Sequence, residues 1–299
     1  MARTYNDLYL DMRQRLLGNG VAMASLEARE IMRHATGRNR AALARDRHLY
    51  VPPEAEAAAL ALLERRLAGE PIAYIVGEWE FFGLTFAVSP AVLIPRVDTE
   101  VLAGAAIAGA RARGPGARVL DLCTGSGCVG LAVASYVPGC RVVLGDISDP
   151  ALKVARRNVR RHDLPGRTVC VNVDALAPAP ASLGAFDILV CNPPYVPNED
   201  WDNLDHSVRD YEPRLALDGG PDGLRFYRSV VAGWRTALRR GGQLLFECGV
   251  GQAEAVRSLL YREAYGGIET LRDTGGIERV VTASPVWNEA IREGIAEIE

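Results

Sequence analysis

The fold is decided by one stretch of the chain, Val119-Leu120-Asp121-Leu122-Cys123-Thr124-Gly125-Ser126-Gly127-Cys128-Val129-Gly130. Its first residues are largely apolar, which predicts a buried strand, and the glycines that follow predict a tight turn into a helix. Gly125, Gly127 and Gly130 satisfy the G-x-G-x-x-G pattern, in which a turn brings the backbone close to a ligand at a helix N-terminus. Taken alone, this pattern is too common to identify the ligand.

Strands and helices alternate on both sides of this turn. Asp149 is expected to cap the helix after the second strand, with Pro150 at the first helical position. The turn Asp273-Thr274-Gly275-Gly276 predicts a closing hairpin. The sequence therefore predicts an α/β fold, a seven-stranded doubly wound sheet with a C-terminal antiparallel hairpin. The strands are expected at 118–123, 141–147, 168–174, 186–191, 242–248, 268–272 and 278–282, and the helices between the first strands at 128–136 and 149–162.

Three aspartates follow successive strands of this pattern, at the sheet edge where ligands bind. Asp121 would repel a pyrophosphate but can pair with an ammonium group. Asp146 suits a ribose diol, and Asp174 is placed to border an adenine. A ligand with an ammonium group, a ribose and no phosphate is S-adenosylmethionine. The expected cofactor-binding residues are Asp121, Cys123, Thr124, Gly125, Ser126, Gly127, Asp146, Asp174, Ala175 and Asn192.

A second informative stretch is Phe186-Asp187-Ile188-Leu189-Val190-Cys191-Asn192-Pro193-Pro194-Tyr195. It predicts a buried strand that stops at Asn192, because the prolines that follow cannot donate ladder hydrogen bonds. The side-chain oxygen of Asn192 and the carbonyl of Pro193 can each accept one N–H of a planar amide or amine, and Tyr195 can pack on its plane. We expect Asn192, Pro193 and Tyr195 to be catalytic, and Asn192, Pro193, Pro194 and Tyr195 to bind the substrate. No general base is evident.

The N-terminal part of the chain predicts helices only. Leu8, Met12 and Leu16 recur at helical spacing before Gly18, and further helices are expected at 24–35 and 54–67. An alternating aromatic run at 79–88 predicts a hairpin. Asp98 or Thr99 is then expected to cap a helix that runs to about 113. We expect three parts, namely an N-terminal helical bundle at 1–75, a β-hairpin linker at 76–95 and the main domain at 96–299, with a surface helix from Pro285.

Composition limits the possible functions. The chain has 299 residues, of which 48% are hydrophobic and 24% charged, as in ordinary soluble proteins. Its formal net charge of -3 argues against a protein that wraps nucleic acid. Six cysteines form no Cys-x-x-Cys pair, so no metal site is expected. The sequence has no secretory signal and no apolar run long enough to span a membrane, and a cytoplasmic location is expected.

Asn192-Pro193-Pro194-Tyr195 and the glycine turn together resemble class I S-adenosylmethionine-dependent methyltransferases that act on planar exocyclic nitrogens. Other stretches resemble the HemK/PrmC glutamine methyltransferases, at 69–77, 81–86, 93–100, 211–217, 222–224 and 246–252. This resemblance covers about 10–284. It implies methylation of the side-chain amide nitrogen (N5) of the glutamine in the Gly-Gly-Gln motif of class 1 peptide chain release factors. It also implies substrate recognition by the N-terminal bundle and no direct nucleic-acid substrate.

Three alternatives remain open at the level of sequence. They are a glutamine methyltransferase of a large-subunit ribosomal protein, a DNA adenine methyltransferase, and a non-catalytic cofactor-binding module. The chain also departs from the family pattern. Cys123 stands where the family usually has glycine, Val97-Asp98 replaces the usual Pro-Glu, and Cys248 replaces an apolar residue. Since none of these changes removes a proposed catalytic group, we expect cofactor binding to survive.

Overall fold

The computed structural model describes residues 2–287 and divides the chain into two compact units. The N-terminal unit comprises Met1–Glu78 and Leu204–Tyr211, and the second unit comprises Trp79–Asn203 and Glu212–Glu299. The surface helix predicted from Pro285 falls mostly on residues 288–299, which lie outside the described part of the chain. Pro285 itself is the last residue of a strand.

The N-terminal unit is helical. Leu8, Met12 and Leu16 are fully buried in it, so the helical spacing of these apolar residues is confirmed. Three additional helices, α3, α5 and α9, were not predicted, because six, five and four residues are too few to show a helical period. Its helices are α1 (Tyr5–Gly18), α2 (Ala24–Thr36), α3 (Arg40–Arg45), α4 (Pro53–Leu67), α5 (Ile72–Val76) and α9 (His206–Arg209).

A short hairpin follows the N-terminal helices, as predicted. Its strands, β1 (Glu78–Phe81) and β2 (Leu84–Ala87), form a two-stranded sheet of their own. Gly83 in the turn has a φ of 71°, a left-handed conformation that glycine adopts without strain. Phe81 and Phe86 are buried and join the core of the second unit.

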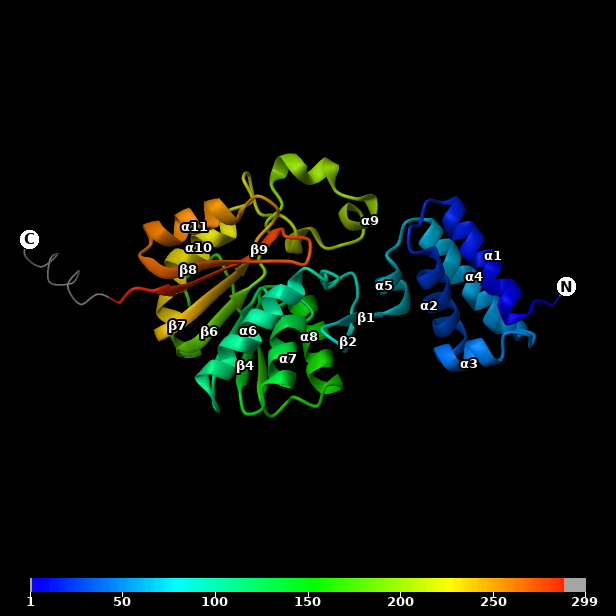
Figure 1. Ribbon diagram of the computed structural model, residues 1–299, viewed down its shortest axis with the longest axis horizontal. Helices are drawn as coiled ribbons and strands as arrows, with labels where there is room; N and C mark the ends of the chain where they lie inside the picture. The colour runs from blue at the N-terminus through cyan, green and yellow to red at the C-terminus, as the bar shows by residue number, and fades with distance from the viewer. Residues whose placement is uncertain (1, 288–299) are drawn as a thin grey trace, which may run out of the picture. The chain divides into compact units, whose positions relative to one another are not determined.

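The second unit contains a seven-stranded sheet in the order β5-β4-β3-β6-β7-β9-β8 (Figure 1). Strands β3 to β7 pair in parallel, and β9 runs antiparallel to both β7 and β8. The predicted doubly wound sheet with a closing antiparallel hairpin is therefore confirmed. The strands are β3 (Arg118–Leu122), β4 (Arg141–Asp146), β5 (Thr168–Asn172), β6 (Phe186–Cys191), β7 (Leu238–Glu247), β8 (Tyr265–Arg272) and β9 (Glu278–Pro285).

The largest differences from the predicted strand boundaries lie in the last three strands, whereas β3, β4 and β5 end one or two residues earlier than predicted. Strand β7 begins at Leu238 rather than 242, because a register shift against β6 accommodates its polar, glycine-containing start. Strand β8 begins three residues earlier than expected, and β9 continues to Pro285. The predicted bounds of β8 and β9 covered only their most apolar residues. In the structure the two strands pair with each other beyond those residues, as far as Tyr265 and Pro285.

Helices cover both faces of the sheet (Figure 1). The first face packs against α6 (Thr99–Arg113), α7 (Cys128–Tyr136) and α8 (Asp149–Arg161), and the second against α10 (Arg225–Gly233) and α11 (Ala253–Arg262). Consecutive residues of β3 are buried in different cores, because successive side chains of a strand point to opposite faces. This burial on both sides explains why the parallel strands are almost continuously apolar.

The predicted cap of α8 is wrong. Ser148, not Asp149, is the N-cap residue, and its hydroxyl accepts a hydrogen bond from the backbone N–H of Ala151 at 3.2 Å. Asp149 is the first helical residue and instead accepts a hydrogen bond from Asn172 Nδ2 at 2.9 Å. Serine and aspartate are about equally good caps, so the sequence Ser-Asp-Pro did not distinguish them.

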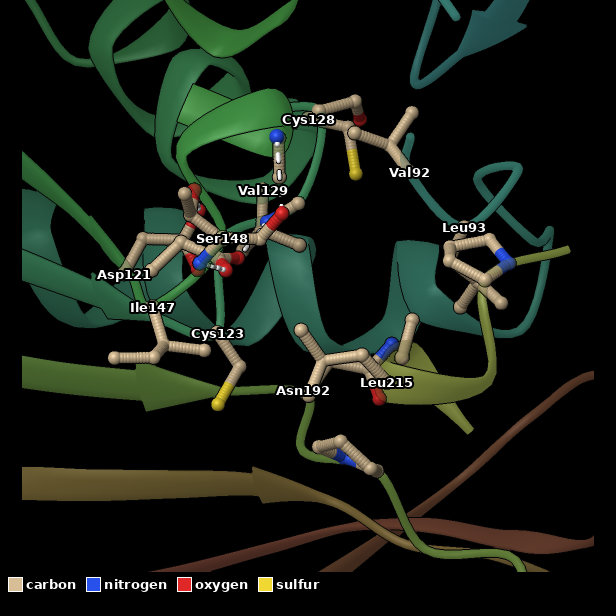
Figure 2. Close-up of a pocket in the computed structure, with 18 of the residues that line it drawn as sticks. Val92, Leu93, Asp121, Cys123, Cys128, Val129, Ile147, Ser148, Asn192 and Leu215 are labelled. Carbon is tan, nitrogen blue, oxygen red and sulfur yellow. Dashed lines mark hydrogen bonds between the residues drawn. The ribbon is translucent and has the colours of Figure 1, made fainter. Parts of the chain in front are cut away.

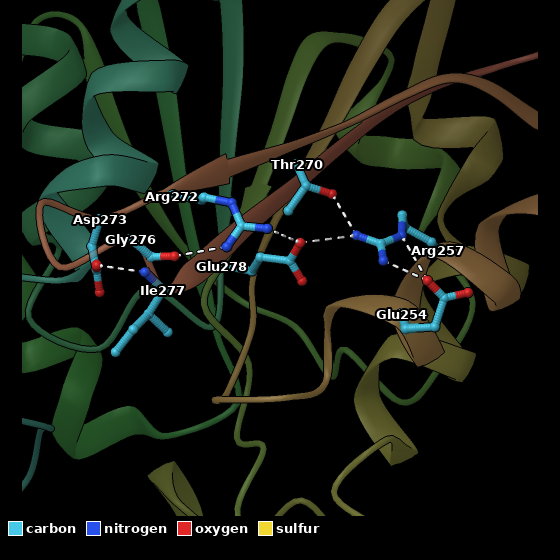
Figure 3. Close-up of polar contacts among 8 residues, drawn as sticks. All are labelled: Glu254, Arg257, Thr270, Arg272, Asp273, Gly276, Ile277 and Glu278. Carbon is cyan, nitrogen blue, oxygen red and sulfur yellow. Dashed lines mark hydrogen bonds and ion pairs between the residues drawn. The ribbon is translucent and has the colours of Figure 1, made fainter.

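Asp98 occupies the N-cap position of α6, but its side chain makes no capping hydrogen bond. Its carboxylate pairs with Arg279 of β9 at 2.6 Å instead. The turn before β9 positions this arginine, since Asp273 accepts a hydrogen bond from the N–H of Ile277 at 3.0 Å and pairs with Arg279 at 2.9 Å. Figure 3 shows Asp273 bound to Ile277 beside the ion pairs that Glu278 forms with Arg272 and Arg257.

Candidate active site

A pocket opens in the second unit at the carboxyl ends of β3, β4 and β6 (Figure 2). Most residues predicted to bind cofactor or substrate line it, namely Asp121, Cys123, Thr124, Gly125, Ser126, Asp146, Asp174, Ala175, Asn192 and Pro194. Gly127, Pro193 and Tyr195 are not among the lining residues. The parallel register of the three strands brings these separate parts of the sequence to one edge.

The glycine turn has the backbone geometry that its composition predicts. Gly125 and Gly127 have φ values of 54° and 84°, and Gly127 is the N-cap residue of α7. Cys123 shares this left-handed conformation with a φ of 61°, which is unfavourable for a residue with a Cβ atom. A Cβ atom on Gly130 would overlap the side chain of Leu144, so helix α7 can approach the sheet only with glycine there.

Asp121 is a buried carboxylate at the end of β3, with 3% of its surface exposed. Its Oδ2 accepts hydrogen bonds from the Thr124 hydroxyl at 2.6 Å and from the Gly130 N–H at 2.9 Å. Its Oδ1 accepts none from the described residues. Burial raises the pKa of Asp121 to about 7, although these two hydrogen bonds oppose the shift. Because a nearby cation stabilises a buried carboxylate, this position fits a ligand ammonium group.

Asp146, the last residue of β4, connects its strand to the glycine turn. Its Oδ2 accepts a hydrogen bond from the Gly125 N–H at 2.8 Å, and its Oδ1 accepts one from the Ser148 N–H at 2.9 Å. Burial raises the pKa of this carboxyl group. Each oxygen of a carboxylate accepts more than one hydrogen bond, so Asp146 can still accept hydrogen bonds from two hydroxyl groups of a ligand.

Asp174 and Ala175 lie just beyond β5, which ends at Asn172 rather than at the predicted 174. Asp174 is exposed, and its Oδ1 accepts a hydrogen bond from the N–H of Leu176 at 2.8 Å. Ala175 is buried, and its carbonyl accepts hydrogen bonds from Ser229 and Trp234. These bonds fix the backbone of this side of the pocket.

Asn192 follows β6 and lines the pocket with its half-buried side chain. Its Nδ2 donates to the hydroxyl of Thr99 at 3.4 Å. Thr99 is the first residue of α6 and also lines the pocket, although it was not predicted as a site residue. The sequence suggests for it only a role as a candidate cap of this helix, alongside Asp98.

Tyr195 does not line the pocket and belongs to a tightly packed loop. Its carbonyl accepts a hydrogen bond from Gln252 Nε2 at 2.9 Å. A Cβ atom on Gly219 would lie 2.7 Å from the Cα atom of Tyr195, so the two backbone segments are in close contact. Burial raises the pKa of the Tyr195 hydroxyl well above its usual value, which keeps the phenol neutral.

Two irregular segments complete the pocket and were not predicted as site residues. They lie before α6 and after α9, and Glu212 connects them by accepting a hydrogen bond from the Ile94 N–H at 3.0 Å and pairing with Arg96. The sequence shows both segments to be rich in proline and apolar residues, but such residues carry no chemical signature. The lining residues from these segments are Ala91, Val92, Leu93, Pro95, Arg96, Pro213, Leu215 and Ala216.

Two family models match the chain. The first, for the PrmC N-terminal domain, matches residues 7–77, and the second, for the methyltransferase small domain, matches residues 106–208. The chain also resembles the solved structure of the hMettl16 catalytic domain in complex with the MAT2A 3′UTR hairpin 6. That likeness has a TM-score of 0.56 and 17% identity, with 79% of this chain and 83% of the other covered. At this identity the likeness supports the fold alone.

Several relatives named release factor glutamine methyltransferase are similar over most of their length. The Geobacter sulfurreducens protein is 42% identical over 89% of this chain and 91% of its own length. The Moorella thermoacetica protein is 40% identical over 90% of this chain and 94% of its own length. The Bordetella pertussis protein is 41% identical over 85% of this chain and 93% of its own length. The chain therefore belongs to the release factor glutamine methyltransferase family, whose methyl donor is S-adenosylmethionine.

Proposed function

We propose that this protein methylates the side-chain amide nitrogen (N5) of the glutamine in the Gly-Gly-Gln motif of class 1 peptide chain release factors. One observation carries the proposal. Asn192 lines the same pocket as Asp121 and Asp146, so an amide held by Asn192 lies next to the cofactor site. The names of the relatives support the release factor as the protein substrate.

The pocket residues fit S-adenosylmethionine by their chemistry. Asp121 would pair with its ammonium group, Asp146 would accept hydrogen bonds from the ribose hydroxyls, and Asp174 and Ala175 would border the adenine. The turn at 123–126, which lines the pocket, would enclose the ligand from the side of α7. When bound, S-adenosylmethionine supplies an electrophilic methyl group on a sulfonium.

The acceptor side of the proposal rests on Asn192 and Pro193. An amide nitrogen is a weak nucleophile because its lone pair is delocalised. By accepting the two N–H groups, the Asn192 Oδ1 and the Pro193 carbonyl would orient that nitrogen and stabilise the positive charge that develops on it. Correct orientation alone supplies on the order of 7–11 kcal/mol in favourable cases. Tyr195 would pack on the amide plane, and the proton would leave after methyl transfer.

The proposal also assigns a role to the N-terminal unit. We infer that the helical domain at 1–75 recognises the release factor, that the hairpin at 76–95 is a linker, and that the protein acts in translation termination in the cytoplasm. The match of residues 7–77 to the PrmC N-terminal domain supports this division. No helix among residues 2–287 is both long and apolar enough to cross a membrane.

A direct methylation assay tests the proposal. The protein is incubated with radiolabelled S-adenosylmethionine and, separately, with a purified release factor, large-subunit ribosomal proteins or DNA, and the labelled residue is mapped by mass spectrometry. We expect label on the Gly-Gly-Gln glutamine of the release factor. Label on a ribosomal protein or on adenine instead would replace the proposed substrate. Cofactor binding without any transfer would indicate a non-catalytic module.

A further inference from the structure

Glu247 is a buried carboxyl group that none of the roles above uses. It is the last residue of β7 and is 2% exposed. In the parallel pairing of β6 with β7, Cys191 lies opposite Phe246. Asn192 and Glu247 are the next residues on these two strands, so both emerge at the same point of the sheet edge. Glu247 does not line the pocket.

The Glu247 carboxyl group is incompletely bonded. The side chains of Thr99 and Asn192 lie close enough to the Glu247 carboxyl group to lower its pKa, whereas its Oε2 atom has no hydrogen-bond partner among the described residues. The hydroxyl of Tyr227 donates to the backbone carbonyl of Glu247 at 2.8 Å, which fixes this end of β7. A buried carboxyl group with a free oxygen is costly for stability. Its presence beside Asn192 therefore calls for a functional explanation.

An asparagine amide has two ends of nearly equal shape, one a donor and one an acceptor. Its orientation is therefore decided by its hydrogen-bond partners. An ionised carboxylate only accepts, so the single proton of the Thr99 hydroxyl is donated to Glu247. The Thr99 oxygen is then left to accept, and it receives a hydrogen bond from Nδ2 of Asn192 at 3.4 Å. The Nδ2 end of the Asn192 amide therefore points toward Thr99.

We propose that Glu247 is a positioning residue that acts through Thr99 and Asn192, orienting the Asn192 amide so that Oδ1 faces the methyl acceptor. Only that orientation presents an acceptor to the N–H group of a substrate amide. In the reverse orientation, the Nδ2 group of Asn192 would face the N–H group of the substrate, and both of these groups are hydrogen-bond donors. The inference rests on the proposed function, because it specifies how the same site holds its planar nitrogen substrate.

The surroundings shift the ionisation of Glu247 toward neutral pH. Burial raises the pKa of Glu247 to about 7, the Thr99 hydrogen bond and Arg279 oppose the shift, and Asp98 adds to it. Arg279 forms ion pairs with Asp98 and Asp273 and none with Glu247 among the described residues. The other titratable groups around Glu247 are Tyr195, Tyr227, Cys128 and Cys248. All four have raised pKa values and are neutral near pH 7.

The test compares the steady-state kinetics of the wild type with those of Glu247→Gln. Glutamine has the same shape but adds a donor, which lets Thr99 donate to the Asn192 oxygen and reverses the amide. We expect kcat on the release factor to fall by about 10- to 100-fold, the equivalent of one hydrogen bond to a charged group. The Kd for S-adenosylmethionine should stay within about twofold, since Glu247 does not line the pocket.

Two further measurements separate positioning from a general structural effect. In the Asn192→Ala background, Glu247→Gln should lower kcat little further, because its partner is already absent. At saturating cofactor, kcat of the wild type should rise with pH through about 7 as Glu247 ionises. That rise should be missing in Glu247→Gln. Thr99→Ser should retain most of the activity and Thr99→Val should not.

Asp187→Asn is the matched control. Asp187 is also a buried carboxylate of the sheet, but it lies at the opposite end of β6, where it pairs with Arg239 at 2.9 Å. This variant should lower the melting temperature without lowering kcat. A wild-type kcat for Glu247→Gln, or fully additive effects with Asn192→Ala, would overturn the inference and leave the proposed function intact. If Glu247→Gln does not fold, equal activities of Thr99→Val and Thr99→Ser would overturn it.

A wild-type protein that binds S-adenosylmethionine but does not methylate the release factor is a different outcome. It would refute the proposed substrate. The orientation of Asn192 would then be tested with the acceptor that the methylation assay identifies, using the same variants and the same Asp187→Asn control.

Discussion

At the scale of single residues, the site depends on side chains whose chemistry is altered by burial. Asp121 and Glu247 are both almost inaccessible to solvent, and burial raises the pKa of each to about 7. Asp121 lines the pocket, whereas Glu247 does not. The sequence predicted a role for Asp121 from its position before the glycine turn. It gave no role to Glu247, because no local pattern distinguishes a buried glutamate from an exposed one at the end of a strand.

Cys123 offers a prediction at the same scale. With a φ of 61°, it has a conformation that costs an L-residue with a Cβ atom roughly 1–2 kcal/mol. Glycine avoids this cost but loses about 0.4–1 kcal/mol through the greater entropy of the unfolded chain. We expect Cys123→Gly to raise the free energy of unfolding by up to about 1 kcal/mol, measured by urea denaturation.

Cys123→Ala is the control for this prediction, since alanine removes the thiol but keeps the Cβ atom in the same conformation. It should show no gain in stability. A Cys123→Gly variant less stable than Cys123→Ala would mean that the unfolded-chain entropy of glycine outweighs the backbone strain of a Cβ atom at this position. S-adenosylmethionine binding, measured by calorimetry, should survive in both variants.

At the scale of elements, the ends of strands and helices matter more than their middles. The prolines after Asn192 end β6 as predicted, and the glycine turn starts α7. Helix α6 begins beside the pocket, with Asp98 paired to Arg279 instead of capping the helix and with Thr99 bound to Asn192. A residue that the sequence suggests as a cap can therefore be used for a tertiary contact, because a long-range partner competes with the local backbone N–H groups.

The corrected cap of α8 gives a prediction at this scale. Ser148→Ala removes the hydroxyl that accepts from the Ala151 N–H, and we expect it to lower the free energy of unfolding by about 1 kcal/mol. Asp149→Ala should cost less, because its side chain bonds only to an exposed asparagine. Thermal or urea unfolding of both variants provides the comparison. The reverse ranking would restore Asp149 as the effective cap.

At the scale of the whole molecule, the buried carboxyl groups predict an unusual dependence of stability on pH. The pKa values of Asp121 and Glu247 are raised to about 7 in the folded protein, above the usual values of 3.8 and 4.5. Between about pH 4.5 and 7 the folded protein therefore holds protons that the unfolded chain has released. Each such proton makes the free energy of unfolding fall by about 1.4 kcal/mol per pH unit.

We expect the ligand-free protein to become less stable as the pH rises through this window, as measured by urea unfolding at several pH values. His162 acts in the opposite direction, since burial lowers its pKa, but it is one group against three, because burial raises the pKa of Asp146 as well as those of Asp121 and Glu247. Asp121→Asn removes one titrating group, so the free energy of unfolding of this variant should fall less steeply with pH. Stability that rises from pH 5 to pH 7 would contradict the raised pKa values.

The sequence by itself predicted the seven strands of the sheet, the helices α6, α7 and α8, the glycine turn, and the meeting of Asp121, Asp146 and Asn192 at one edge of the sheet. These features can be predicted because they depend on local signals. The signals are the periodic spacing of apolar residues, the glycines and prolines that end an element, and the polar residues just after a strand. Only the tertiary structure determined the contact of Glu247 and Thr99 with Asn192, the pocket lining before α6 and after α9, and the true extent of β7. These features depend on which distant strands pair and in what register, and no local sequence pattern encodes that pairing.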